Sequence, residues 1–126
     1  MSRVKVETIK PVFSDERGII TDILRKDIQH AGLITSKKGT TRANHYHEHQ
    51  TQYTYVLKGK IELSTKDLQE ENAEVKTEIV EAGQLITVPE RVIHKYVALE
   101  DYEIITLTTL PRSMKDYEAD THRVEI

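Results

Sequence analysis

Apolar and polar side chains alternate along most of this chain, with the two-residue period of β-strands. In residues 60–65, Ile61 and Leu63 share one face, and polar residues, Ser64 among them, are expected on the solvent side. No segment shows sustained helical periodicity. The pattern predicts about ten short strands, spaced as in an all-β sandwich or barrel. They are expected over residues 3–9, 19–24, 31–35, 40–47, 52–57, 60–65, 75–79, 85–88, 93–99 and 103–109, with a further short strand at 123–126.

Turn chemistry separates these strands. Residues 14–18 (SDERG) combine an aspartate, which can bond its own backbone, with a glycine that can take positive φ. Residues 67–74 (DLQEENAE) are polar throughout and are expected to form a solvated loop. Residues 102–110 are apolar on both faces of their strand. One face can line a barrel, and the other is then expected to meet a second copy of the chain in a homodimer.

Composition limits the classes of protein that the chain can represent. Its 126 residues fit one domain, 1–126, with enough length for a real core. The net charge of -3 argues against a nucleic-acid partner. No apolar run approaches the ~18–20 residues that a membrane span needs, and no apolar signal region opens the sequence. The chain has no cysteine, which fits a reducing compartment, so a cytoplasmic protein with no membrane association is expected.

The chemistry-bearing residues gather in residues 39–59. His45 and His47 are two apart, so a strand points both side chains to the same side. A loop at 48–51 can return the chain so that Gln52 faces them from the next strand, and His94 can supply a third imidazole. Imidazoles and an amide oxygen suit a first-row divalent metal. Zn, Ni, Fe and Mn all remain candidates.

The spacing of these residues resembles the two motifs of the cupin family. Residues 39–59 follow the first motif and residues 83–98 the second, in which Gly83, Pro89 and His94 match. The resemblance implies a small single-domain jelly-roll β-barrel (a double-stranded β-helix), often dimeric. It also implies a metal held by His45, His47, residue 52 and His94. The family has glutamate where this chain has Gln52, so a divalent ion would keep its full charge and favour anionic ligands.

Three further segments resemble the sugar-nucleotide branch of the cupins. Residues 12–18 (VFSDERG) are similar to a segment of the dTDP-4-keto-6-deoxyglucose 3,5-epimerases. Residues 41–47 (TRANHYH) resemble those epimerases and, more closely, the C-terminal cupin domain of capsular-polysaccharide reductases. Residues 88–96 follow the same branch. The resemblance implies that Arg17 and Arg42 bind the diphosphate of an anionic nucleotide sugar and that His45 is the base.

A keto nucleotide sugar offers acidic protons beside its carbonyl group. A base removes one proton and an acid returns it elsewhere, which gives epimerisation or keto-isomerisation. His45 suits the base role, and Tyr96 is the candidate acid because strand parity points it to the same side as His94. A histidine that ligates a metal cannot also be a free base. Two mechanisms therefore stay open: a metal polarises the carbonyl, or the site is metal-free and His45 takes the proton.

Two other classes of function compete with the isomerase. One is a metal-dependent dioxygenase of a small organic substrate, a common cupin activity. The other is a non-catalytic module that binds a metal or a sugar. Residues outside the metal motif, Arg17 and Arg42, favour the isomerase. The remaining histidines, His30, His49 and His122, have no partner at useful spacing and are expected at the surface.

Overall fold

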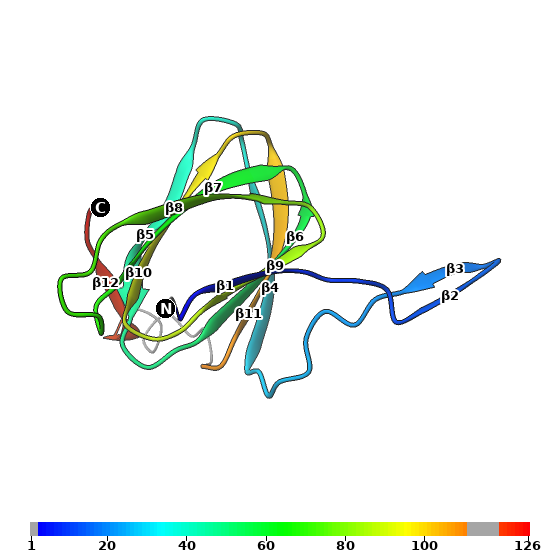
Figure 1. Ribbon diagram of the computed structural model, residues 1–126, viewed down its shortest axis with the longest axis horizontal. Coiled ribbons are helices and arrows are strands. Elements are labelled where there is room, and N and C mark those ends of the chain that lie inside the picture. Colours follow the sequence, from blue (N-terminus) through cyan, green and yellow to red (C-terminus); the bar gives the residue numbers. More distant parts are fainter. Residues whose placement is uncertain (1–2, 111–118) are drawn as a thin grey trace.

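A computed structural model describes residues 3–110 and 119–126, and in these residues the chain forms two facing five-stranded sheets and a separate hairpin. Figure 1 shows the two sheets curving around a common interior. Every paired strand is antiparallel. The all-β cupin barrel predicted from the sequence is confirmed.

Each sheet is named here by its strands. Sheet I contains, in spatial order, β1 (Lys5–Thr8), β9 (Gln84–Val88), β6 (Gln52–Lys58), β11 (Tyr102–Thr108) and β4 (His30–Ser36). Sheet II contains β12 (Thr121–Arg123), β5 (Thr41–His47), β10 (Val92–Ala98), β7 (Lys60–Asp67) and β8 (Lys76–Glu81). The hairpin pairs β2 (Phe13–Asp15) with β3 (Gly18–Ile20).

The inner faces of the two sheets divide into an apolar part and a polar part. The apolar part is a cluster that includes Val56, Ile61, Leu63, Ile86, Val92 and Ile104, all at most 1% exposed. Burying one such side chain stabilises a fold by roughly 1.5–3 kcal/mol. Further along the same strands the inner positions are polar, with Gln52, Thr54, Thr106 and His94 each less than 9% exposed. The apolar part holds the sheets together, and the polar part is left for chemistry.

A β-bulge in β5 decides which of its side chains enter the barrel. His45 pairs with His94 and Ala43 with Lys95, so Asn44 is an extra residue in this strand. Ala43 and Asn44 have φ of 73° and 58°, in the left-handed region that asparagine tolerates well. Without the bulge, Arg42 and His45 would face opposite sides, because they are three residues apart. With it, Arg42 lies across from Tyr96 and His45 across from His94, both on the inner face.

The β2–β3 hairpin stands clear of the barrel (Figure 1). Apolar side chains along it are exposed: Val12 at 58%, Phe13 at 44%, Ile19 at 63% and Ile20 at 59%. The predicted strand at 19–24 is wrong in extent, because β3 ends at Ile20. Its partner β2 was not predicted, because its three residues are too short for a periodic pattern.

Two polar positions expected in solvent are buried. Asp67 ends β7 at 7% exposure, where it receives two hydrogen bonds from Arg3 at 2.9 and 2.8 Å. Ser64 is 4% exposed, and its hydroxyl bonds that of Thr77 at 3.1 Å. In both cases the hydrogen-bonded partner compensates the free-energy cost of burying a polar group. Alternation of apolar and polar residues alone cannot reveal such partners.

The C-terminal strand is β12, slightly earlier than expected, and residues 111–118 of the predicted tail lie outside the described residues. Within residues 3–110 and 119–126, no helix has the length and apolar character needed to cross a membrane.

Candidate functional site

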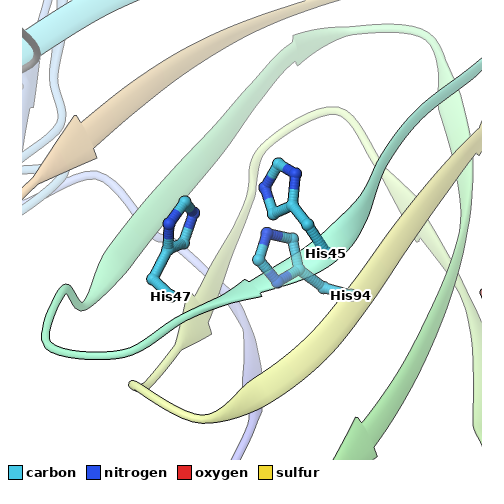
Figure 2. A group of neighbouring side chains, drawn as sticks. All are labelled: His45, His47 and His94. Carbon is cyan, nitrogen blue, oxygen red and sulfur yellow. The ribbon is translucent and has the colours of Figure 1, made fainter. Parts of the chain in front are cut away.

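Three buried histidines meet inside the barrel (Figure 2). His45 and His47 come from β5 and His94 from the neighbouring β10, and each is at most 6% exposed. The ring centroids of His45 lie 4.7 Å from those of both His47 and His94, and the last two are 5.4 Å apart. Each ring offers one nitrogen within 4.8 Å of the others. The convergence expected from the spacing of these residues is therefore present, and we call them the histidine trio.

The ring of His94 is held in one orientation and one protonation state. Its Nδ1 lies 3.1 Å from the carbonyl oxygen of Val92, which can only accept, so Nδ1 carries the proton. Its Nε2 is buried and has no hydrogen-bond partner in the part of the chain that the structure describes. Burial, with a smaller contribution from His47, lowers the pKa of His94 to about 4. His94 is therefore neutral at pH 7 and keeps a lone pair on Nε2.

The C-terminal strand supports the trio from outside. The hydroxyl of Thr121 lies 3.3 Å from Nδ1 of His47, which it faces across the β5–β12 pair. Asp120 accepts hydrogen bonds from the backbone N–H groups of His49 and Gln50, at 2.9 and 3.2 Å. These contacts fix the loop that follows His47. The sequence carried no signal for them, because the tail around Asp120 reads as a polar surface segment.

Gln52 and Tyr96 meet at the centre of the barrel. The amide nitrogen of Gln52 donates to Tyr96 Oη at 3.3 Å and, more weakly, to Thr54 Oγ1 at 3.4 Å. Tyr96 Oη and Thr54 Oγ1 are 3.2 Å apart. The Tyr96 ring lies 5.8 Å from that of His94. The Gln52 amide nitrogen is thus engaged with hydroxyl groups, and its carbonyl oxygen is the atom left for a further ligand.

This donor set fits a first-row divalent ion. Neutral imidazole nitrogens and an amide carbonyl oxygen are donors that Zn, Ni, Fe and Mn accept. The Nε2 of His94 is a buried lone pair for which these residues provide no proton donor. The hydrogen bond from its Nδ1 to a carbonyl is the orienting contact that metal-bound histidines commonly make.

Arg42 lies at an open cavity of about 620 Å³ between β4 and β5. Its Nε donates to the Ser36 hydroxyl at 2.5 Å and its Nη2 to the Thr35 carbonyl at 3.0 Å. Lys37 and Lys58 also line this cavity, together with the acidic residues Asp101 and Glu103. Arg42 lies across from Tyr96 in the β5–β10 pair, whereas the trio, Gln52 and Tyr96 do not line this cavity.

Arg17 lies elsewhere. It occupies the turn of the β2–β3 hairpin with its side chain 81% exposed. Its guanidinium pairs with Asp15, with an Nη2–Oδ2 distance of 2.6 Å. The hairpin projects away from the barrel (Figure 1), so within one chain the two arginines predicted to bind diphosphate do not converge.

Of the other histidines, only two lie at the surface as expected. His49 is 77% exposed and bonds Asp120 at 2.9 Å. His122 stacks on Tyr46, with ring centroids 4.9 Å apart. For His30 the expectation is wrong, because it is half-buried on a strand whose alternate residues face the barrel interior.

Comparison with known proteins gives the chain a family. Residues 13–122 match the family described as the polysaccharide biosynthesis C-terminal domain. The chain belongs to this family. The matched range includes both predicted arginines and the whole histidine trio. A curated relative is the spore coat polysaccharide biosynthesis protein SpsL of Bacillus subtilis (strain 168). It is 25% identical over 122 residues, which cover 88% of this chain and 81% of that protein.

Several solved structures share the fold of this family member. The sugar 3,4-ketoisomerase QdtA of Thermoanaerobacterium thermosaccharolyticum, solved with TDP, superposes with a TM-score of 0.76 at 20% identity, covering 96% of this chain and 88% of that one. A 3,4-ketoisomerase from Helicobacter canadensis gives 0.80 at 14% identity, covering 98% and 92%. ChmJ, a 3'-monoepimerase from Streptomyces bikiniensis solved with dTDP-quinovose, gives 0.80 at 15% identity, covering 96% and 69%. The resemblance to sugar-nucleotide cupins is thus confirmed for the fold.

Proposed function

We propose that this protein is an isomerase or epimerase of a keto nucleotide sugar, acting by proton transfer next to the carbonyl in polysaccharide biosynthesis. The observation that carries the proposal is the buried histidine trio, with the Tyr96 ring 5.8 Å from that of His94 and Arg42 across from Tyr96 in the β5–β10 pair. The family and the folds of the ketoisomerases and epimerases support it. The dioxygenase and the non-catalytic module have no comparable support outside the trio.

Different residues would bind the diphosphate and transfer the proton in such a reaction. Arg42, with Lys37 and Lys58 on the same cavity, can bind the diphosphate, since a guanidinium forms charge-assisted hydrogen bonds to phosphate oxygens. The sugar would then extend along the inner face toward Tyr96 and the trio. Tyr96 Oη, already in a hydroxyl and amide network, can give a proton to the developing enolate or to carbon. The apolar cluster behind these groups excludes water from that side.

We propose that His45, His47 and His94 hold a divalent transition metal, with the Gln52 carbonyl oxygen as a further ligand. Such an ion supplies Lewis-acid polarisation of a carbonyl oxygen when it is bound. Elemental analysis of tag-free protein prepared without chelator tests this. Near-stoichiometric metal that is lost in His47→Ala is the expected result. Metal-free wild-type protein that still turns over would instead make His45 the base.

We further propose that two copies of the chain associate. The hairpin exposes four apolar side chains, and a two-stranded hairpin alone is only marginally stable in water. Leu33, 65% exposed on edge strand β4, stands in register with Ile105, and Ile105 with Tyr55, on the outer face of sheet I. A two-fold pairing lets each copy cover the other's apolar surface with the same patch. Light scattering should give twice the chain mass, and monomeric protein at micromolar concentration would contradict the pairing.

Incubation with dTDP- and UDP-linked 4-keto-6-deoxy sugars in D₂O tests the proposed reaction. Proton NMR of the recovered sugar should show deuterium at a carbon adjacent to the carbonyl, and its position separates keto-isomerisation from epimerisation. A protein that exchanges no proton of any of these sugars, with or without added metal, is not this enzyme. Oxygen consumption, together with recovery of a sugar that carries no deuterium, would favour the dioxygenase.

A further inference from the structure

We infer that His30 is a proton-transfer residue of the barrel interior, acting from the wall opposite the histidine trio. It opens β4, the edge strand of sheet I, whereas the trio belongs to sheet II. The inference rests on the proposed function, because it names the group that moves a proton in that reaction.

The register of sheet I places His30 on the inner face. His30 pairs with Thr108, and Thr108 pairs with Gln52. Thr108 is 3% exposed and Gln52 is 8% exposed, and residues directly opposite in antiparallel strands share a face. Alternation along β4 agrees, since Ile34 packs on the core cluster and Ser36 is 8% exposed. His30, Thr108 and Gln52 therefore lie in one row across sheet I, and the Gln52 side chain contacts Tyr96.

The ring of His30 has an uncommitted nitrogen. Its Nδ1 is buried and has no hydrogen-bond partner among the described residues. The adjacent Thr108 hydroxyl donates to the Leu110 carbonyl at 2.9 Å, so its proton is already used. An unsatisfied buried nitrogen costs roughly 1–3 kcal/mol, which a protein rarely carries without a use for the group.

Gly32 keeps the space that this ring occupies. A Cβ at Gly32 would lie 3.0 Å from Cε1 of His30, closer than ordinary van der Waals contact. Its φ is not in the left-handed region, so backbone freedom does not explain this glycine. Glycine inside a strand sacrifices packing and often marks a close approach of another group. Here that group is the imidazole of His30.

The inner faces next to His30 carry few charged or titratable groups. On the inner faces of β4 and of β11, its one neighbour in sheet I, the titratable group is Tyr102 at the far end of the strand. The remaining inner positions of the described strands are Gly32, Ile34, Ser36, Ile104, Thr106 and Thr108. The imidazoles of the trio belong to β5 and β10 of the other sheet. Within the described strands, no carboxylate lies on these two inner faces to pair with His30.

This placement resolves which group moves the proton when the trio holds a metal. A ring-nitrogen lone pair of His30 takes the proton from the carbon next to the carbonyl. The electron pair of that C–H bond forms the carbon–carbon double bond, and the carbonyl oxygen takes the negative charge. For keto-isomerisation, the hydroxyl proton on the deprotonated carbon passes to the former carbonyl oxygen, and the imidazolium gives its proton to the former carbonyl carbon, which leaves a new carbonyl on the neighbouring carbon. For epimerisation, Tyr96 instead protonates the opposite face of the carbon that lost its proton.

The first test compares His30→Gln with the control His122→Gln, whose side chain lies at the surface on Tyr46. Deuterium wash-in to the keto sugar and calorimetric binding of dTDP are measured for each. We expect His30→Gln to lose at least about 100-fold in exchange rate, the usual contribution of a general base, while nucleotide affinity stays within about threefold. His122→Gln should match wild type in both.

Two further variants separate proton transfer from a structural role. Added imidazole should restore exchange to His30→Ala, which opens a cavity beside Gly32, and should leave His30→Gln unchanged. Gly32→Ala should slow exchange by displacing the ring and should add nothing to His30→Gln, since both act on one group. Wild-type exchange rates in His30→Gln would overturn the inference alone. Absence of exchange in wild type would overturn it together with the proposed function.

Discussion

The cavity between β4 and β5 and the β2–β3 hairpin each contain an arginine that sequence resemblance assigns to diphosphate, and the two arginines have different surroundings. Arg42 bonds Ser36 and the Thr35 carbonyl and lies across from Tyr96, whereas Arg17 pairs with Asp15 on an exposed turn. The bulge at Ala43 and Asn44 puts Arg42 on the same side of β5 as His45, whereas the hairpin projects away from the barrel (Figure 1). Resemblance to a family motif thus identifies a candidate residue in the sequence. Strand pairing and register decide whether its side chain lies near the other residues of the site.

Among the predicted effects, the largest losses of metal affinity and of deuterium exchange are expected from substitutions in the histidine trio. His47→Ala removes a ring whose side chain is 2% exposed and bonded by Thr121. We expect at least about a 100-fold loss of metal affinity and of exchange, because even orienting residues around metal ligands contribute 10–100-fold. Competition with a chromogenic chelator measures the affinity. The exposed His49→Gln is the matched control, and equal losses in both variants would contradict the assignment.

The second-largest predicted effect is a pH dependence of the free energy of unfolding, caused by the buried imidazole of His94. The pKa of His94 is about 4 in the folded chain and about 6.5 when unfolded. Between these values the unfolded chain binds the proton and the folded chain does not, so stability falls as pH decreases from about 6.5 to 4. The loss totals about 3 kcal/mol. Urea unfolding of chelator-treated protein measures it, and His94→Leu should flatten this part of the profile.

Nucleotide binding by variants of Arg42 and Arg17 tests the contrast between these two arginines. Arg42→Gln should weaken dTDP binding by about 10-fold, as expected when one charge-assisted contact is lost. Arg17→Gln should change the affinity less than about twofold if a single chain forms the whole site. Isothermal titration calorimetry measures the dTDP affinity of both variants. A loss at Arg17 equal to that at Arg42 would mean that the hairpin reaches the site of a second copy.

The smallest effect is on stability, through two aspartates that each pair with an arginine. Asp67→Asn should cost about 1 kcal/mol, because Asp67 is 7% exposed and receives two bonds from Arg3. The hydrogen bond from Arg3 lowers the pKa of Asp67, so this cost is present above pH 3.8 and fades as pH falls below it. Asp15→Asn on the hairpin should leave the urea midpoint unchanged. Equal midpoint shifts in the two variants would contradict the contrast.

The sequence predicted those parts of the molecule that depend on strand parity. Alternation along the chain predicted the sheets. The two-residue spacing of His45 and His47, together with His94 in the second motif, predicted the trio. Parity also brings Tyr96 to the trio, with its ring 5.8 Å from that of His94.

Other features depend on register and on long-range partners, which a single sequence does not display. His30 enters the interior because β4 pairs with β11 in one particular register, and a shift of one residue would turn it outward. Asp67 is buried because Arg3, 64 residues away, bonds it. Asp120 and Thr121 support His47 from a segment with no periodic pattern.

Solvent deuterium exchange tests the central claim most directly, when wild type and His45→Gln are incubated side by side with a dTDP-4-keto-6-deoxy sugar. His45 is 6% exposed and lies 4.7 Å from both other rings, so it belongs to the site as metal ligand or as base. The account predicts deuterium next to the carbonyl with wild type and at least about a 100-fold slower exchange with His45→Gln. Equal exchange in the two proteins would place the chemistry outside the trio, and no exchange in either would contradict the proposed reaction.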